Sequence, residues 1–171
     1  MEDLREDPRY GPAAPDDLAG IRELLARCQL PADDLRPSQL AHFVLCRDLH
    51  KLVGTVGLEP LGEVALLRSL AVAPEVRGRG IGHQLWARAR ERASALGIQH
   101  LYLLTTTAEG LFARWGFRRI ARDEVAEAVR GTAEYSMLCP STAVVMALRL
   151  SAGRVAAEIV PTPLPGAGNQ H

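Results

Sequence analysis

A short loop in the middle of the chain combines three glycines with two arginines, which are residue types suited to binding phosphate. The loop reads Arg77-Gly78-Arg79-Gly80-Ile81-Gly82 and joins an apolar stretch, 64–73, to a stretch with helical periodicity, 80–96. Glycines let the backbone approach a ligand, the first amides of a helix are free to bind an anion, and arginine adds positive charge. This order of strand, glycine-rich turn and helix predicts a phosphate-binding site.

Two familiar phosphate loops do not fit these residues. A dinucleotide-binding loop has the spacing Gly-x-Gly-x-x-Gly, whereas the glycines here lie at 78, 80 and 82. The strand before them begins near residue 64, which is late for a first βαβ unit. A Walker loop needs Gly-Lys followed by Ser or Thr, and the loop contains no lysine. An ordinary strand-to-helix turn with two solvated arginines remains possible.

The composition limits the other kinds of partner. The chain has 171 residues, 47% of them hydrophobic, and its 20 basic and 20 acidic residues cancel. Without a global basic field we expect neither nucleic acid nor a membrane as a partner. No apolar run reaches the roughly 18 residues that span a bilayer, and the polar N-terminus is unlike a secretory signal. The three cysteines are an odd, widely spaced set, which favours reduced thiols in the cytoplasm and no metal site.

Hydrophobic periodicity and turn residues predict a single domain of α/β (α+β) class with a mixed sheet. Residues 1–9 are predicted to be flexible, 10–150 to form the domain, and 151–171 to be a mostly disordered tail. Helices are predicted at 16–28, 37–42, 80–96 and 108–115, and strands at 43–48, 51–58, 64–73, 98–106, 117–121 and 143–150.

Two segments together resemble the signatures of the GNAT acetyltransferase superfamily. Leu70-Ala71-Val72, followed by Pro74 and the glycine loop, is similar to the first signature, and the segment 108–117 is similar to the second. The resemblance covers about residues 10–150. It implies a splayed sheet of six or seven strands, with acetyl-CoA as the cosubstrate in the cleft where the strand carrying Leu70–Val72 parts from the strand 101–106.

The resemblance also implies roles for individual residues. The main chain of Leu70 and Val72 would hold the pantetheine arm, and the amides of the glycine loop would hold the pyrophosphate. Thr105 stands where the family often has Asn, and its hydroxyl could still bond to the cofactor. Phe112 occupies the position where many members have a Tyr that protonates the leaving thiolate, and a phenyl ring cannot donate a proton. The proton for the thiolate would then come from water, from a hydroxyl such as that of Thr105 or Thr107, or from the substrate amine.

A closer resemblance is to the arsenic-resistance N-acetyltransferases, and a more distant one is to the acetyltransferase domain of N-acetylglutamate synthases. The stretches that carry the closer resemblance are 57–60, 67–72, 105–109 and 139–143. Both families imply a small amino acid, or an analogue such as an arsenic-containing one, as the acceptor amine. A degenerate acetyl-CoA-binding module with a sensing or interaction role is the alternative from another class. A homodimer is left open.

Glu59 is the preferred candidate for the base that neutralises the acceptor amine. It and Glu63 flank the turn between two strands, near the expected mouth of the cleft. The position further along the strand where some protein-acetylating relatives carry an acidic residue is Leu66 here. A solvated turn carboxylate, with water removing the proton, is the alternative interpretation of Glu59.

Arg68 interrupts an apolar strand and therefore needs an anionic partner, because a buried unpaired guanidinium costs several kcal/mol. That partner is either a carboxylate or oxyanion of the substrate or a structural carboxylate such as Glu59 or Glu63. Arginine suits bidentate binding of an oxyanion, and Ser69 next to it could donate one more bond.

Overall fold

A seven-stranded mixed sheet organises the part of the chain that the computed structural model describes, residues 7–138 and 142–151. The strand order is β1-β2-β3-β4-β5-β7-β6, and every neighbouring pair is antiparallel except β4 and β5. The strands are β1 (Arg9–Pro12), β2 (Phe43–Asp48), β3 (Lys51–Leu61), β4 (Val64–Val72), β5 (His100–Thr105), β6 (Arg118–Ile120) and β7 (Val144–Arg149).

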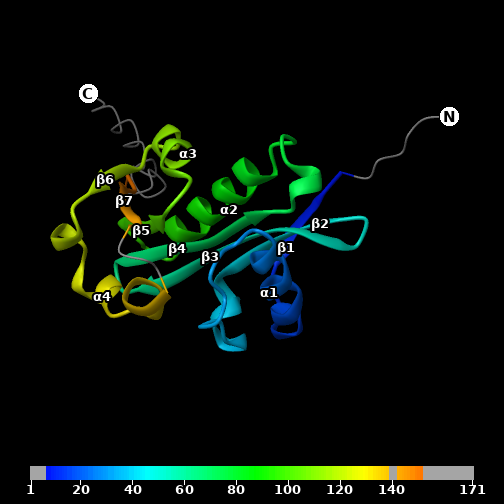
Figure 1. The fold of residues 1–171 in the computed structure, drawn as a ribbon, viewed down its shortest axis with the longest axis horizontal. Coiled ribbons are helices and arrows are strands. Elements are labelled where there is room, and N and C mark those ends of the chain that lie inside the picture. The colour runs from blue at the N-terminus through cyan, green and yellow to red at the C-terminus, as the bar shows by residue number, and fades with distance from the viewer. Residues whose placement is uncertain (1–6, 139–141, 152–171) are drawn as a thin grey trace, which may run out of the picture.

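Helices cover both faces of this sheet. Figure 1 shows α2 along one face and α1 on the other, while α3 and α4 lie toward the end of the sheet where β5, β6 and β7 pair. The α-helices are α1 (Leu18–Arg27), α2 (Ile81–Ala95), α3 (Glu109–Arg114) and α4 (Glu127–Arg130). The shorter helical turns are η1 (Pro15–Asp17), η2 (Pro37–His42), η3 (Pro74–Val76), η4 (Arg122–Glu124) and η5 (Glu134–Leu138).

The pairing of β4 with β5 is short, and this determines where a cleft can form. The two strands are in register only over Val64–Leu66 and His100–Tyr102. Beyond Leu66, β4 continues to pair with β3 on its other side as far as Val72, while β5 pairs with β7. The two central strands therefore run on without a shared ladder and leave their facing edges available.

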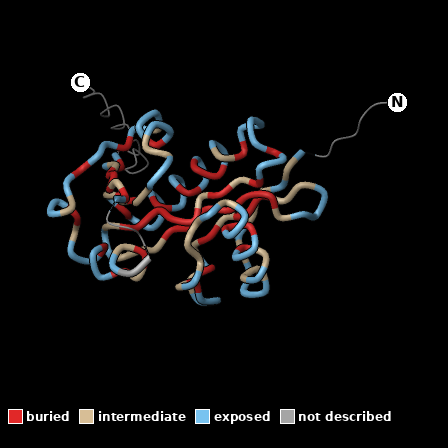
Figure 2. Tube along the Cα trace, in the orientation of Figure 1, coloured by how far each residue is buried: buried red, intermediate tan, exposed pale blue. Residues whose placement is uncertain are grey.

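Two apolar clusters hold the described chain together, and Figure 2 shows the buried positions following the central strands and the inner faces of the helices. The main cluster joins α1 and α2 to the sheet, with Ile21, Leu25 and Leu85 fully buried. A smaller cluster contains Leu66, Ile120, Val125, Val129, Val145 and Ala147. The smaller cluster attaches α4 to the outer part of the sheet.

The structure confirms the predicted fold class and each of the predicted elements to within a few residues. The tight turn at Leu49-His50 has both residues at positive φ, as a type I′ hairpin turn requires. Sequence reasoning missed β1, α4 and the short helical turns η3, η4 and η5. The predictions for residues 1–6, for Cys139 and for the tail from 152 lie outside the described residues, and Arg9, predicted to be flexible, begins β1. None of the described helices is both long and apolar enough to cross a membrane.

Gly57 lies in a closely packed part of the sheet beside the cleft, where a substitution can measure the packing. It pairs with Phe43 on one side and with Arg68 on the other, and the Phe43 ring occupies the space that a side chain at 57 would need. We expect Gly57→Ala to lower the free energy of unfolding by about 1–3 kcal/mol, because the ring must move.

The control is Gly110→Ala in α3, where an added Cβ meets nothing within 4 Å. This variant should gain about 0.5–1 kcal/mol from helix propensity. Chemical denaturation of both variants measures the difference, and equal stabilities would contradict the packing described.

Candidate functional site

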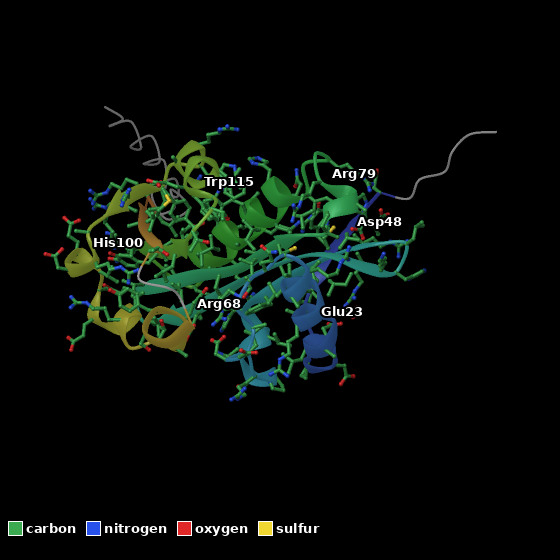
Figure 3. All side chains as sticks on the ribbon, in the orientation of Figure 1. Glu23, Asp48, Arg68, Arg79, His100 and Trp115 are labelled. Carbon is green, nitrogen blue, oxygen red and sulfur yellow. The ribbon has the colours of Figure 1, made fainter. Side chains whose placement is uncertain are left out.

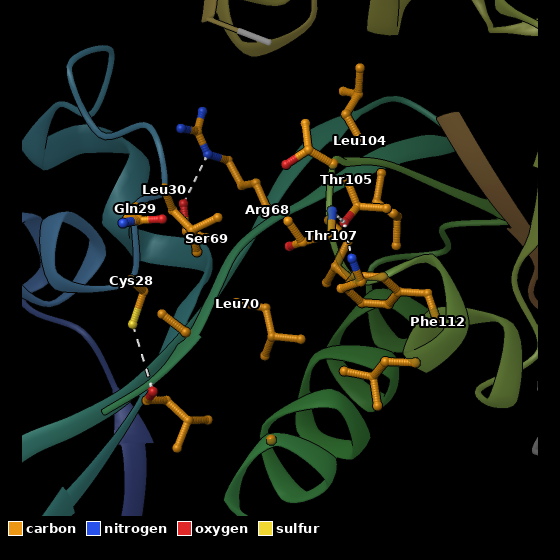
Figure 4. Close-up of a pocket in the computed structure, with 18 of the residues that line it drawn as sticks. Cys28, Gln29, Leu30, Arg68, Ser69, Leu70, Leu104, Thr105, Thr107 and Phe112 are labelled. Atoms are coloured by element: carbon orange, nitrogen blue, oxygen red, sulfur yellow. Dashed lines mark hydrogen bonds between the residues drawn. The ribbon is translucent and has the colours of Figure 1, made fainter. Parts of the chain in front are cut away.

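A cleft of about 890 Å³ opens between β4 and β5 where their pairing ends. Figure 4 shows its two walls, with the segment after α1 on one side and the end of β5 with α3 on the other. The residues that line it include Cys28, Gln29, Leu30, all of Leu67–Val72, Leu103–Ala108, Phe112, Trp115, Glu134 and most of the glycine loop. The cleft therefore unites the sequence-predicted positions 68–72, 77–82, 105 and 112, of which Arg79 alone is not among the lining residues.

A bulge in β4 shapes the floor of the cleft. Arg68 pairs with Gly57 and Ala71 pairs with Thr55, so Ser69 and Leu70 together face the single residue between. Ser69 has φ +57°, a left-handed conformation that costs free energy for a residue other than glycine. Such bulges bend a strand and redirect its side chains. This one lies in the part of β4 that follows the end of its ladder with β5.

The glycine loop closes one end of the cleft and leads into α2. Gly78 and Gly80 have φ +82° and +80°, and a Cβ on either would meet no atom within 4 Å. The first helical hydrogen bond runs from the amide of Gln84 to the carbonyl of Gly80, so the amides before it are free of the α2 ladder. An open loop with free amides at a helix start is the geometry of an anion site.

The two loop arginines are placed differently. Arg77 lines the cleft, where its Nε donates to the Val72 carbonyl at 3.0 Å and its Nη2 lies 3.6 Å from Cys28 Sγ. Arg79 lies away from the cleft and pairs with Asp48 at 3.0 Å, and Figure 3 shows this pair toward the β1–β2 end of the molecule, far from Arg68. The Val72 carbonyl, expected to contact a pantetheine arm, already accepts the bond from Arg77.

The opposite wall is built on α3 and an aromatic cluster. The Thr105 hydroxyl oxygen accepts bonds from the amides of Ala108 at 2.9 Å and Thr107 at 3.4 Å, which fixes the turn into α3. The Phe112 ring packs edge-on against Trp115 and Phe117, with centroids 5.6 and 5.7 Å apart. Thr105 therefore keeps its hydroxyl hydrogen available, and Phe112 gives the wall an apolar surface.

At the other end of the cleft, Arg68 stands among three carboxylates. Its side chain is 1% exposed, and its two terminal nitrogens bond to the two oxygens of Asp34, one at 2.7 Å. Glu59 Oε2 lies 3.5 Å from Nη1, and Glu134 Oε2 lies 3.6 Å from Nε. Burial alone would lower the pKa of Arg68, but the hydrogen bonds that it donates to Asp34 and the three negative charges hold it above its ordinary value. Arg68 thus has a structural anionic partner, one of the two possibilities that its sequence position leaves open.

Glu134 is the site residue that sequence reasoning missed. Glu134 is 6% exposed and lines the cleft, and its Oε2 accepts no hydrogen bond from the described residues. Burial, helped by the negative charges of Asp34 and Glu59, raises the pKa of Glu134 to about 7 against the opposing charge of Arg68. A buried carboxyl that titrates near neutral pH is a common property of functional groups.

The turn that carries Glu134 is fixed by local hydrogen bonds. The Thr132 hydroxyl donates to the Val129 carbonyl at 2.7 Å and accepts the Tyr135 amide at 3.3 Å. The Tyr135 hydroxyl lies 3.5 Å from the carbonyl of Arg122, whose guanidinium lies over the Tyr135 ring. Because α4 is anchored by the smaller apolar cluster, these bonds hold η5 and Glu134 against the cleft.

Of the other predicted residues, Glu59 and Ser69 lie beside Arg68. Glu59 faces the guanidinium but is not among the residues that line the cleft, whereas Ser69 lines it and accepts a bond from Arg68 Nε at 3.2 Å. Glu63 is exposed at the β3–β4 turn. Among the described residues, no three His, Cys, Asp or Glu side chains form a group that could hold a metal ion.

Comparisons with known proteins agree with this arrangement. Residues 39–119 match the family model described as an acetyltransferase (GNAT) domain. The amino-acid acetyltransferase of Ralstonia nicotianae is 31% identical over 140 residues, which are 74% of this chain and 29% of that protein. The corresponding protein of Pseudomonas syringae pv. syringae is 30% identical over 124 residues, covering 68% of this chain. The chain thus spans less than a third of these curated relatives.

Solved structures show the same fold. The N-acetylglutamate synthase of Neisseria gonorrhoeae, in complex with coenzyme A and L-arginine, has a TM-score of 0.70 and 23% identity, with 84% of this chain and 33% of that chain covered. The protein Rv2747 of Mycobacterium tuberculosis, in complex with CoA and NLQ, has a TM-score of 0.69 and 25% identity, with 84% and 99% covered.

The raised pKa of Glu134 should make the stability of the folded chain depend on pH. In the unfolded chain this carboxyl has a pKa of ~4.3, whereas in the folded chain its pKa is about 7. As the pH rises from about 4.3 to 7, the carboxyl therefore loses its proton in the unfolded chain before it does so in the folded chain. The folded state is therefore progressively penalised between about pH 4.3 and 7. We expect Glu134→Gln, which carries no charge, to gain Tm over the unmodified chain as the pH rises from 5 to 7 and to gain no more above that.

Thermal unfolding between pH 5 and 8.5 measures this difference. Glu127→Gln, at an exposed glutamate of α4, serves as the control and should show no such trend. If the difference in Tm between Glu134→Gln and the unmodified chain is the same at every pH, the buried carboxyl has an ordinary pKa.

Proposed function

We propose that the chain, whose residues 39–119 match the acetyltransferase (GNAT) domain family, transfers the acetyl group of acetyl-CoA to the amine of a small amino acid. The observation that carries the proposal is the continuity of the cleft. One cavity runs from the glycine loop at the start of α2, along the free edge of β4, to the buried carboxylates around Arg68. A phosphate site and an amine site thus lie at the two ends of one channel.

The residues present fit coenzyme A. The open space at Gly78 and Gly80 leaves room for the pyrophosphate, the first amides of α2 can bond to it, and Arg77 adds charge. The edge of β4 that faces away from β3 can hold the amide groups of the pantetheine arm by main-chain bonds at Leu70 and Val72, where the Val72 carbonyl is shared with Arg77. Acetyl-CoA supplies the thioester carbonyl that the acceptor amine attacks.

The leaving thiolate needs a proton donor or a stabilising dipole. Phe112 provides neither, because its ring carries no polar hydrogen. Thr105 lines the same wall, and in its bonds to the amides of Thr107 and Ala108 the oxygen is the acceptor, so its hydroxyl hydrogen can be donated. We therefore assign the role to the Thr105 hydroxyl in preference to water, the Thr107 hydroxyl or the substrate amine.

The curated relatives named amino-acid acetyltransferase support an amino acid as the acceptor. The pairing of Arg68 favours an acceptor that is not a dicarboxylic acid. A second carboxylate would need a cation, and the Arg68 guanidinium is already bonded to both oxygens of Asp34. The finer proposal is an amino acid with an uncharged side chain, which includes an arsenic-containing side chain that carries no negative charge. The arsenic-containing acceptor is supported by the four stretches that resemble arsenic-resistance acetyltransferases.

Turnover with a panel of amines tests the proposal. The purified chain is mixed with acetyl-CoA and each of the twenty L-amino acids, an arsenic-containing amino acid, a polyamine and a peptide amine, and free thiol is measured with a chromogenic disulfide. We expect acetylation of at least one free amino acid above the peptide. Coenzyme A binding without turnover on any amine would favour the sensing module instead.

Arg77 gives a test of the cofactor end. Because it lines the cleft beside the free amides, Arg77→Ala should weaken coenzyme A binding about tenfold, or about 1.4 kcal/mol. Arg90→Ala, at an exposed position of α2 outside the cleft, is the control and should leave the Kd unchanged. Isothermal titration measures both, and equal dissociation constants would remove Arg77 from the phosphate site.

A further inference from the structure

The corner of the cleft around Arg68 carries more negative than positive charge. Asp34, Glu59 and Glu134 all lie within ion-pair distance of the single guanidinium. We propose that this corner is a binding site for a cationic amine, in which Glu134 contacts the ammonium group of the acceptor, takes its proton, and makes the enzyme prefer acceptors without a side-chain carboxylate. This inference rests on the proposed acetyltransferase function and identifies the residue that selects and activates the acceptor.

The three carboxylates have different positions relative to the cleft. Asp34, from the segment between α1 and η2, uses both oxygens to neutralise Arg68. Glu59, on β3, approaches the same guanidinium without lining the cavity. Glu134 alone of the three is among the residues that line the cavity. Arg68 lines the cleft, but its charge is neutralised by Asp34, which is not among the lining residues, so Glu134 presents the excess negative charge to the cavity.

The second observation is the unsatisfied oxygen of Glu134. The side chain is 8% exposed, and Oε2 lies 3.6 Å from Arg68 Nε but accepts no hydrogen bond from the described residues. That Nε instead donates to Ser69 Oγ at 3.2 Å. A buried carboxylate oxygen without a donor is unfavourable, and an ammonium group in the cleft would supply both the donor and the countercharge.

The surroundings of Glu134 also suit proton transfer. The charged groups that face it are Arg68 from β4, Asp34 from the segment before η2 and Glu59 from β3. Burial and the two carboxylates bring its pKa to about 7, against the opposing charge of Arg68. At neutral pH a large fraction is ionised and able to accept a proton, and its conjugate acid is much weaker than that of an exposed carboxylate.

The step is balanced without a further reactant. The ammonium N–H bond breaks, the proton moves to Glu134 Oε2, and the freed electron pair of the nitrogen attacks the thioester carbonyl. The C–N bond forms, the C–S bond breaks, and the nitrogen loses its second proton, leaving the amide and the thiolate. That second proton passes through the Thr105 hydroxyl or water to the thiolate, which becomes the free thiol of coenzyme A, and Glu134 returns the first proton to solvent.

The experiment uses the acceptor that turns over fastest in the amine panel. Glu134→Gln should reduce kcat/KM for that acceptor at least about 100-fold, the lower range for loss of a positioned base. The acid limb of the kcat/KM profile, with an apparent pKa near 7 in the unmodified chain, should disappear. Glu134→Asp should restore part of the rate, and the KM for acetyl-CoA should stay within about twofold.

The preference among acceptors is tested with two isosteric pairs, L-glutamine with L-glutamate and L-asparagine with L-aspartate. The unmodified chain should favour the amide of each pair about tenfold or more, and Glu134→Gln should narrow the difference, because the repelling charge is gone. Glu127→Gln, at an exposed glutamate, should leave both the rate and the preference unchanged.

The outcomes separate the two proposals. An unmodified chain that acetylates an amine, together with a Glu134→Gln variant that is within threefold of it at every pH, overturns the role of Glu134 and leaves the acetyltransferase proposal intact. A faster reaction with the dicarboxylic member of each pair overturns the cationic-amine site. An unmodified chain with no turnover on any amine overturns both proposals.

Discussion

The parting of β4 from β5 is the constraint on which the candidate site depends. A parallel pair that continued to the ends of both strands would bond every main-chain group along the facing edges and leave no space between them. Here the shared ladder covers only Val64–Leu66 and His100–Tyr102, and the bulge at Ser69 and Leu70 lies in the part of β4 that runs on beyond it. Antiparallel pairing with β3 and β7 keeps each strand rigid while they diverge. The sheet can therefore contain a cleft without losing its stability.

Arg68 connects the parts of the chain that form the acceptor end. A buried guanidinium must be compensated, and here the compensating carboxylates come from three separate segments: the loop after α1, strand β3 and the turn η5. The same desolvation that makes this arrangement costly strengthens each interaction inside it. The charge of Arg68 also lowers the pKa of Glu134 against the larger effect of burial, so one group contributes both to the architecture and to the chemistry.

The sequence predicts local features of this protein better than its distant contacts. Hydrophobic periodicity and the turn residues locate α2 and the β2–β3 hairpin, because both depend on neighbours in the chain, and the glycine loop is recognised from its own composition. Arg68 is recognisable as a residue that needs an anion, but its main partner, Asp34, lies 34 positions away and carries no local signal. Glu134 lies in a short π-helical turn whose position depends on α4 packing against β4, which no periodicity reveals. The only local hint is a carboxylate within a moderately apolar segment.

The separation of the apolar residues into two clusters has a kinetic consequence. The glycine loop and α2 belong to the large cluster, whereas the segment that carries Glu134 is attached through the smaller one. Since the free energy of local opening grows with the apolar surface that is exposed, the acceptor end should exchange its amide hydrogens with solvent sooner than the cofactor end. The molecule is thus built so that one end of its cleft can open transiently while the other keeps its shape.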